Sequence, residues 1–296
     1  MSRSTSPSAN KPYGLARVCR VWKIPRATAC RHRSAIDAPP PSNAKRGPKS
    51  VLSDQQILDA IRTVLEHPEF LGEGYRKVWA RLRHQLGIRT AARRVLRIMR
   101  EHDLLAPTRA GVPRGPVEHD GTIVTERPDQ MWAIDATGCL TAEGNAAVFV
   151  VIDHCTGECL GAHAARRGTR FEAIECLRQA IWATKGHYEV GIAAGTSLRH
   201  DHGSQFISNA FQDELKTVGI ESSPSFVRQP EGNGCVERFI RTLKEQLLWI
   251  RPFDSIEQLN AALREFAQRF NERWILGRLG YRTPAQHRRS LLAQAA

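Results

Sequence analysis

RHDHGSQF (residues 199–206) and GNGCVERFIRTLKEQLL (residues 232–248) are the most informative parts of this sequence. Each contains a carboxylate that stands out, Asp201 in the first and Glu237 in the second, and 35 residues separate the two. A third carboxylate, Asp135, lies upstream in MWAIDATG, residues 131–138. Three acids drawn from three separate segments suggest an oxygen cage for a divalent metal ion.

The predicted elements around the three acids support this interpretation. Asp135 lies in the middle of an apolar strand, where an ionised carboxylate is rare unless it is paired or bound to metal. Asp201 ends a short predicted strand, and Glu237 falls on the first turn of the helix that follows. Mg²⁺ prefers carboxylate oxygens as ligands, so it is the expected metal, and Mn²⁺ is expected to be able to replace it. Two such ions about 3.5–4 Å apart can activate an attacking oxygen and stabilise a leaving one. We expect Asp135 to bridge both ions, and Asp201 and Glu237 each to complete the shell of one.

Two basic residues share a helix face with Glu237. Arg241 and Lys244 follow it at positions i+4 and i+7, so the three side chains are expected on one side of the helix. Such a face can hold a metal and a phosphodiester, or it can be an ordinary solvated face with an ion pair. The presence of Asp135 and Asp201 favours the first interpretation.

Other polar side chains near these segments have simpler interpretations. Asp153 ends a predicted buried strand and leads into a tight turn, where Asp is favoured for its turn chemistry. His200 and His202 flank Asp201 and are secondary candidates for contact with DNA or water. Glu231 lies in a loop and ranks below Glu237 as a ligand. Cys155 and Cys159 lack the second ligand pair that a structural zinc site requires.

The composition is that of a globular protein with two or three domains. The chain has 296 residues, of which 41% are hydrophobic and 25% charged. No apolar run approaches the roughly 18 residues that span a bilayer, and the first residues lack the apolar core of a signal peptide. Seven scattered cysteines are typical of reduced thiols. We therefore expect a cytoplasmic, nucleoid-associated protein with no membrane contact.

The net charge of +13 is concentrated at the front of the chain. Residues 1–50 contain eleven Lys and Arg against a single acid, Asp37, and residues 51–110 contain eleven against seven. The remainder is close to neutral, with 21 basic and 22 acidic residues. A basic front on a neutral body indicates a polyanionic partner, although a solvated basic tail without a partner has the same composition.

The basic front begins with a predicted helical pair. Residues 1–35 are expected to contain two short helices, of which Pro25 ends the first. Arg31 and Arg33 lie on the second helix, the one that enters the major groove in a helix-turn-helix. Any basic helical hairpin has this pattern, so DNA binding by this pair is a hypothesis. Residues 36–52 are basic and rich in proline, and are expected to form a linker.

Residues 53–105 are predicted to form a three-helix DNA-binding domain. Apolar residues repeat at helical spacing from Ile57 and again from Tyr75, and Thr90 is expected to cap the third helix. A basic outer face on the third helix favours a helix-turn-helix, with a basic helical spacer as the alternative. The candidates for DNA contact on this face are Arg93, Arg94 and Arg97.

Residues 129–250 are predicted to form an α/β domain with a mixed five-stranded sheet flanked by helices. Its elements follow as three strands, a helix, a strand, a helix, a strand and a helix. AAVFVVID (146–153) is a nearly continuous apolar run, typical of a strand buried on both faces. A Pro- and Gly-rich linker over 106–128 precedes this domain, and a helical segment over 251–296 follows it.

These motifs resemble the DDE transposases of bacterial insertion sequences, of the orfB type, the branch related to retroviral integrases. The resemblance rests on PDQMWAID, VVID with its turn, DHGSQF, GNGCVERFIRTLKEQL, and the closing segment FNERWILGRLGYRTPAQ. It implies an RNase H-like core with Asp135, Asp201 and Glu237 as the catalytic, metal-binding triad. Family members cut a DNA end by hydrolysis and join its 3′ hydroxyl to a target strand. Lys244 matches a basic residue that contacts the element's end.

The main hypothesis is therefore a transposase whose basic helical modules bind element ends while its α/β core transfers strands. The expected partners are element-end DNA, target DNA, further copies of the chain on DNA, and a protein from an upstream reading frame. One alternative is an RNase H-like metal nuclease that cuts without joining. Another is a DNA-binding regulator derived from a transposase, with an idle core. Residues 222–235 are expected to be mobile until metal and DNA arrive.

Overall fold

A computed structural model describes residues 4–37, 51–66, 69–107, 123–225 and 233–295 of the chain. These residues fall into two compact units, Met1–Ser53 and Asp54–Ala296, each of which is described by itself. Among the described residues, no helix is long and apolar enough to cross a bilayer.

The first unit is the predicted helical pair. Helix α1 (Leu15–Val21) and helix α2 (Arg26–Asp37) flank the turn that contains Pro25. Helix α2 extends two residues into the segment expected to be a linker, most of which lies outside the described residues. Cys19 is the buried residue of α1, and Arg31 and Arg33 are exposed on α2.

The second unit begins with the three predicted helices, α3 (Asp54–Glu66), α4 (Tyr75–Gln85) and α5 (Ala92–Glu101). Their apolar stripes meet in a small core that buries Ile57, Ile61, Val78, Leu82, Val95 and Met99. The prediction that Thr90 caps α5 is wrong: the N-cap is Ala91, with no side-chain cap bond. The carbonyl of Thr90 instead accepts a hydrogen bond from the indole of Trp79 at 2.7 Å, which ties α4 to the start of α5.

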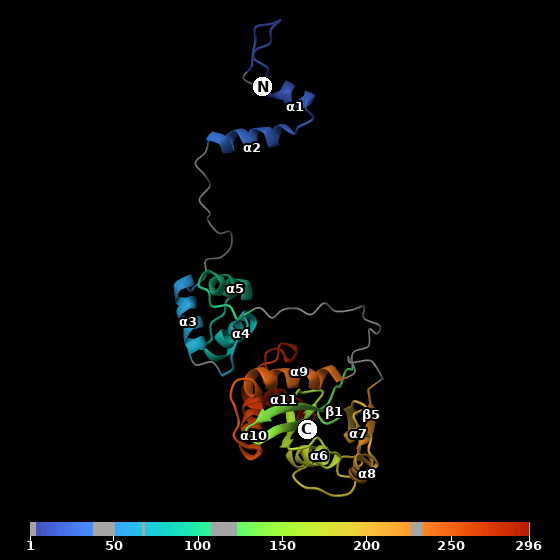
Figure 1. The fold of residues 1–296 in the computed structure, drawn as a ribbon. Coiled ribbons are helices and arrows are strands. Elements are labelled where there is room, and N and C mark those ends of the chain that lie inside the picture. The colour runs from blue at the N-terminus through green and yellow to red at the C-terminus, as the bar shows by residue number, and fades with distance from the viewer. Residues whose placement is uncertain (1–3, 38–50, 67–68, 108–122, 226–232, 296) are drawn as a thin grey trace. The chain divides into compact units, whose positions relative to one another are not determined.

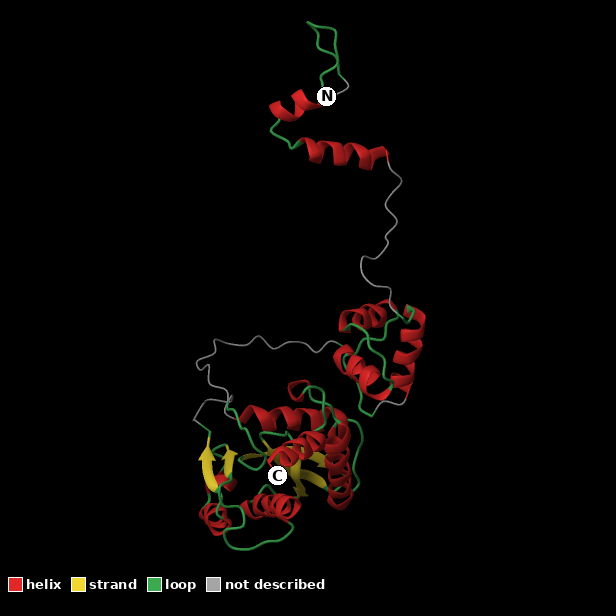
Figure 2. Ribbon diagram, turned by 180° about the vertical axis from the view of Figure 1, so that it is seen from behind, coloured by secondary structure: helices red, strands yellow, loops and turns green. Residues whose placement is uncertain are grey.

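A mixed five-stranded sheet follows, as predicted. Its strands are β1 (Met131–Thr141), β2 (Gly144–Asp153), β3 (Cys159–Ala165), β4 (Ser197–His200) and β5 (Glu221–Pro224), in the order β3-β2-β1-β4-β5. Strands β1 to β3 pair antiparallel, while β1 with β4 and β4 with β5 pair parallel. The strands lie between helices in Figure 2.

Helices cover both faces of this sheet. On one face, Trp132 and Ile134 of β1 pack against α6 (Arg170–Lys185), α7 (Ser204–Ile207) and α8 (Asn209–Val218). On the other, Ala133 of β1 packs against α9 (Gly234–Leu243), the π-helical segment η2 (Lys244–Leu248) and α10 (Ile256–Arg273) (Figure 1). Because side chains alternate along a strand, Asp135 belongs to the face that α9 covers.

The C-terminal helices complete the core. Asn260 and Asn271 of α10 each use their amide oxygen and nitrogen to bond both backbone groups of one residue on the edge strand β3, all at 2.8 Å. These bonds occupy part of the strand edge that would otherwise be open to pairing. Helix α11 (Pro284–Ala295) is anchored by Arg288, which donates to both carboxylate oxygens of Asp129 at 2.9 and 3.0 Å and also bonds Glu158.

Candidate active site

The sheet register brings Asp135 and Asp201 to the same level. Strand β1 pairs with β4 as Trp132 with Leu198 and Ala133 with Arg199. Continued by two residues, this parallel register places position 135 beside position 201, across the roughly 4.8 Å that separates neighbouring strands. The pairing of β4 with β1 therefore brings two acids that lie 66 positions apart in the sequence near each other, and the charge of Asp201 acts on Asp135.

Asn233 holds the start of α9 against the same part of β1. Its side-chain amide donates to the carbonyl of Ile134, the residue before Asp135, at 3.3 Å, and Asn233 is only 5% exposed. Glu237 follows in the first turn of α9, as expected from the sequence. Sequence reasoning did not select Asn233; its position immediately before a helix, where Asn is favoured, was the available signal.

The pKa of Asp135 records the charges around it. The pKa of this carboxyl is raised from 3.8 to about 6. Burial is the largest cause and the negative charges of Asp201 and Glu237 act in the same direction, while the hydrogen bond from the Ala136 amide and the charge of Lys244 act in the opposite direction. Burial also raises the pKa of Glu237. The three predicted acids and Lys244 are therefore close enough to interact, and the group has an excess of negative charge that a bound cation would neutralise.

The donor set fits a hard divalent cation in its chemistry, because it consists of carboxylate oxygens. In the described part of the chain, no three His, Cys, Asp or Glu side chains lie close enough together to hold a metal ion, so the three predicted acids are not gathered into a metal-binding arrangement. One oxygen of Asp135 accepts from the amide of Ala136 at 2.7 Å, and one oxygen of Asp201 accepts from the amide of Gly203 at 2.8 Å. The arrangement is thus more open than a metal-bound triad, as catalytic contacts often are before ligands bind.

The two basic residues that follow Glu237 on its helix, Arg241 and Lys244, have different surroundings. Lys244 begins η2 and contributes its charge to the Asp135 environment. Arg241 is exposed and donates to Glu245 at 3.0 Å, an i,i+4 ion pair on the surface. Such pairs contribute only about 0–1 kcal/mol, so DNA could displace Glu245 at small cost.

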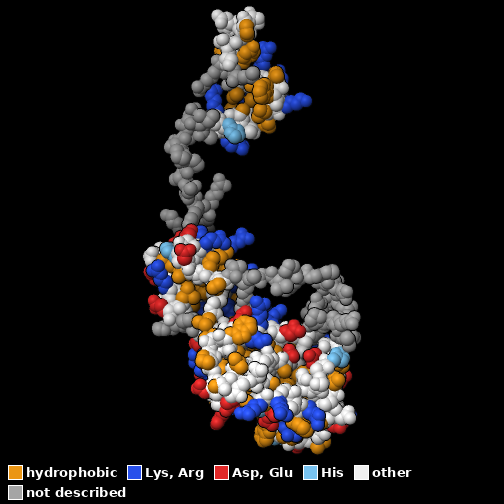
Figure 3. All heavy atoms as spheres, viewed as in Figure 1, with side chains coloured by type: hydrophobic (Ala, Val, Ile, Leu, Met, Phe, Trp, Pro, Cys, Tyr) orange, Lys and Arg blue, Asp and Glu red, His pale blue; other side chains and the backbone are white. Residues whose placement is uncertain are grey.

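The arginines of α5 also differ in their surroundings, since some are ion-paired and others are exposed. Arg94 and Arg97 both bond Asp54 at the start of α3, and these two side chains, Arg97 first, lower the pKa of Asp54 to about 2. Arg97 also bonds Glu101. Arg93 is exposed. Figure 3 shows Lys and Arg side chains on the surface of both the α1–α2 pair and the α3–α5 domain.

Asp153 and His200, which lie near the segments of the three acids, are both buried and hydrogen-bonded. The turn role predicted for Asp153 is confirmed, because its buried carboxylate accepts from the Thr156 amide at 2.6 Å and the Asp129 amide at 2.8 Å. His200 is buried and donates from Nδ1 to the carbonyl of Asp201 at 2.7 Å. The hydroxyl of Ser222 then donates to Nε2 at 2.9 Å, and burial lowers the pKa of the imidazole. His200 therefore supports the backbone of Asp201 as a neutral side chain.

Residues 222–235, which were expected to be mobile until metal and DNA arrive, are described only at their two ends. Residues 226–232, which include Glu231, lie outside the described residues. On either side, strand β5 extends to Pro224 and helix α9 begins at Gly234. His202 is exposed beside Asp201.

Comparisons with known proteins match both the sheet domain and the three-helix domain that precedes it. One integrase core domain model matches residues 125–230, and a second model with the same description matches residues 218–284. An HTH-like domain model matches residues 53–111. Transposase InsD for insertion element IS2A/D/F/H/I/K of Escherichia coli is 29% identical over 245 residues, which cover 80% of this chain and 79% of that protein. The chain belongs to the insertion-sequence transposases with an integrase core.

Solved structures similar to this transposase include viral integrases. The simian T-cell lymphotropic virus intasome in complex with the PP2A regulatory subunit B56 gamma has a chain with 20% identity and a TM-score of 0.48, covering 77% of the transposase and 74% of that chain. The HTLV-2 integrase catalytic core domain in complex with magnesium, in its trimeric form, has 20% identity and a TM-score of 0.41, covering 55% and 97% respectively.

Proposed function

We propose that this transposase hydrolyses the ends of its insertion element and joins the 3′ hydroxyls to target DNA, using Asp135, Asp201 and Glu237 as its catalytic residues. The observation that carries the proposal is the charge environment of Asp135. A half-buried carboxyl whose pKa is raised by burial and by two further acids is costly to keep ionised without a cation. Carboxyls whose pKa values are shifted by burial and by neighbouring charges cluster at functional sites.

Mg²⁺, with Mn²⁺ as a substitute, is the proposed cofactor, and two ions are expected. Bound at these carboxylates, the metal would supply Lewis-acid activation of a phosphodiester and its attacking oxygen. The remaining work belongs to the protein. Asp135, held by β1, would hold the metal together with Asp201 and Glu237. Lys244 would bind a phosphate of the element's end, because its charge already reaches the acidic cluster.

The α1–α2 pair and the α3–α5 domain are proposed to bind the DNA ends. Arg31 and Arg33 on α2 and Arg93 on α5 are exposed and suited to phosphate or base contact. Arg94 and Arg97 would first have to leave Asp54, so we propose a mainly structural role for them until DNA binds. Further copies of the chain, and a protein from an upstream reading frame, are proposed partners on the DNA. The proposed location is the cytoplasm, in association with the nucleoid.

A strand-transfer assay tests this proposal. The substrate is a labelled duplex copied from inverted repeats flanking the coding region, incubated with wild-type protein, Mg²⁺ and a target plasmid. We expect both a nicked end and a joined product, and neither in EDTA. Nicking without joining would favour the metal nuclease. End binding without either reaction would favour a DNA-binding regulator.

A further inference from the structure

The loop between α3 and α4 inserts a phenylalanine into the core of the catalytic domain. Phe70 is only 2% exposed and belongs to the same apolar cluster as the residues under α9 and α10. Its ring meets that of Trp274 edge-on, with centroids 4.6 Å apart and planes at 87°. The guanidinium of Arg269 lies 5.4 Å from the centre of the Phe70 ring. The helical DNA-binding domain is thus anchored directly to the catalytic core.

The next residue of this loop is bonded to the catalytic helix. The side-chain amide of Gln246 accepts from the backbone N–H of Leu71 at 2.8 Å and donates to its backbone C=O at 2.9 Å. Gln246 is 8% exposed, so this buried glutamine is paired through both ends of its amide. A residue 175 positions earlier in the chain therefore satisfies a polar group that would otherwise be costly to bury.

Further contacts surround this pair. Arg273 of α10 bonds both carboxylate oxygens of Glu69 at 2.8 and 3.0 Å. The ammonium group of Lys77 lies 3.0 Å from the centre of the Trp274 ring, and the rings of Trp79 and Tyr281 are 5.6 Å apart. Contacts on both the loop and helix α4 define one specific docking surface.

Gln246 lies on the same helical segment as Lys244 and Glu237, so its contact with Leu71 can influence the position of both. Helix α9 carries Glu237 and continues without interruption into η2, which begins at Lys244 and contains Gln246. Short π-helical turns within α-helices are frequent at functional sites. A displacement of Gln246 would therefore be transmitted to Lys244 two residues away and, through α9, to Glu237.

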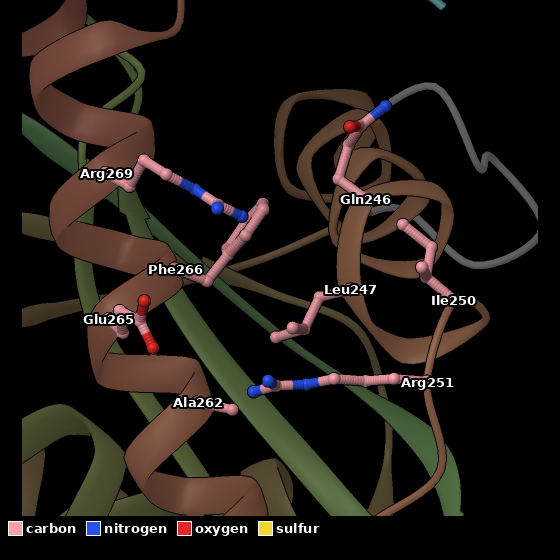
Figure 4. Close-up of a pocket in the computed structure, with 8 residues that line it drawn as sticks. All are labelled: Gln246, Leu247, Ile250, Arg251, Ala262, Glu265, Phe266 and Arg269. Carbon is pink, nitrogen blue, oxygen red and sulfur yellow. The ribbon is translucent and has the colours of Figure 1, made fainter. Parts of the chain in front are cut away.

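A pocket next to Gln246 leaves space for such a displacement. It has a volume of about 170 Å³ and lies between η2 with its following turn and α10 (Figure 4). Leu247 and Phe266 line it on opposite sides, and Gln246 is at its rim. The pocket is partly open to solvent, so this side of η2 is less closely packed than an enclosed core.

We propose that Phe70, Leu71, Gln246 and Trp274 form a latch that couples the DNA-binding domain to the catalytic helix. In this latch Gln246 is a positioning residue: it keeps Glu237 and Lys244 in a fixed relation to the domain that holds the DNA end. The inference rests on the proposed function, because it concerns how a bound end reaches the three acids. Opening the latch should leave end binding intact and impair the chemical step.

The test compares Gln246→Met with Gln268→Met. Methionine fills a volume similar to that of glutamine but cannot bond Leu71, while Gln268 is an exposed residue of α10 and serves as the control. The readouts are the Kd for a labelled end duplex, the single-turnover rate of strand joining, and hydrogen exchange at the Leu71 amide. We expect Gln246→Met to change Kd less than about threefold, to slow joining at least tenfold, and to accelerate exchange at Leu71. The control should match wild type in all three.

Several outcomes would overturn the latch. Joining at the wild-type rate despite accelerated exchange at Leu71 would show that the contact does not position the catalytic helix. An equal loss of DNA binding and of strand joining in Gln246→Met would show that Gln246 only supports folding. Phe70→Leu, which keeps the site apolar, provides a second variant with the same expected division between binding and rate. If wild-type protein joins no ends, the proposed function fails and the latch with it; if wild type joins and Gln246→Met joins equally well, only the latch fails.

Discussion

Replacing Asp135 with asparagine should stabilise the metal-free protein at neutral pH. The carboxyl has a pKa of about 6 in the folded chain against 3.8 as its ordinary value, so the folded state resists its ionisation. One pKa unit corresponds to about 1.4 kcal/mol, which sets an upper limit of about 3 kcal/mol for the cost. Partial exposure to solvent reduces the expected gain for Asp135→Asn to about 1–2 kcal/mol.

The sign of the pH dependence follows from the same shift. Below pH 3.8 the carboxyl is protonated in both folded and unfolded chains, so the variant should gain nothing over wild type. Between about pH 4 and pH 6 the unfolded chain releases the proton first, and wild type loses stability relative to the variant. Above pH 6 the difference should be constant.

Urea unfolding in EDTA at pH 4, 5, 6 and 7.5 measures this difference. Asp213→Asn is the control, because Asp213 is an exposed residue in a surface ion pair with Lys216 and should give nearly wild-type stability at each pH. Millimolar Mg²⁺ should stabilise wild type and not Asp135→Asn, which reduces or reverses the difference at pH 7.5. A variant less stable than wild type in EDTA at pH 7.5, or a difference independent of pH, would refute the raised pKa of Asp135 on which the prediction rests.

Three further predictions concern DNA. Asp201→Asn should bind an end duplex within about threefold of wild type in a gel shift and give no joined product; retained joining would remove Asp201 from the catalytic set. Arg93→Ala should weaken DNA binding without changing the urea midpoint. Arg94→Ala should lower the urea midpoint because it loses its bond to Asp54. Equal effects of the two substitutions on stability would contradict the assignment of Arg93 to DNA binding and Arg94 to the fold. Binding should fall steeply with salt, and Lys244→Ala should reduce the slope of log K against log[salt] by about 1; an unchanged slope would mean that Lys244 contacts no phosphate.

Much of this architecture could be predicted from local sequence patterns. The apolar run at 146–153 and the predicted strand around Asp135 correspond to β2 and β1. The predicted order of strands and helices from residue 129 to α9 is confirmed except for the short helix α7, which was not predicted. Ser255 caps α10, since its hydroxyl accepts from the amide of Gln258, and Ser is a residue type favoured at this position. These features depend on residues close together in the chain, which is why periodicity and capping rules identify them.

Features that depend on distant residues could not be predicted in this way. Nothing local to EQLL indicates that Gln246 will bond Leu71, or that Phe70 will be buried under α10. The pairing of Arg94 and Arg97 with Asp54 required knowledge of how α5 packs on α3, and a helix face that appeared free for DNA proved partly occupied. Thr90 was a reasonable cap by residue type, but helix α5 begins one residue later than that cap requires.

The central claim is that Asp135, Asp201 and Glu237 together hold the catalytic metal. Its most direct test is the anomalous scattering of Mn²⁺ in crystals of the protein grown with a duplex copied from the element's end. The proposed mechanism predicts manganese peaks bounded by these three carboxylates, with Asp135 shared if two ions bind. Well-ordered manganese bound elsewhere, with the three carboxylates free of metal in the presence of DNA, would contradict the claim.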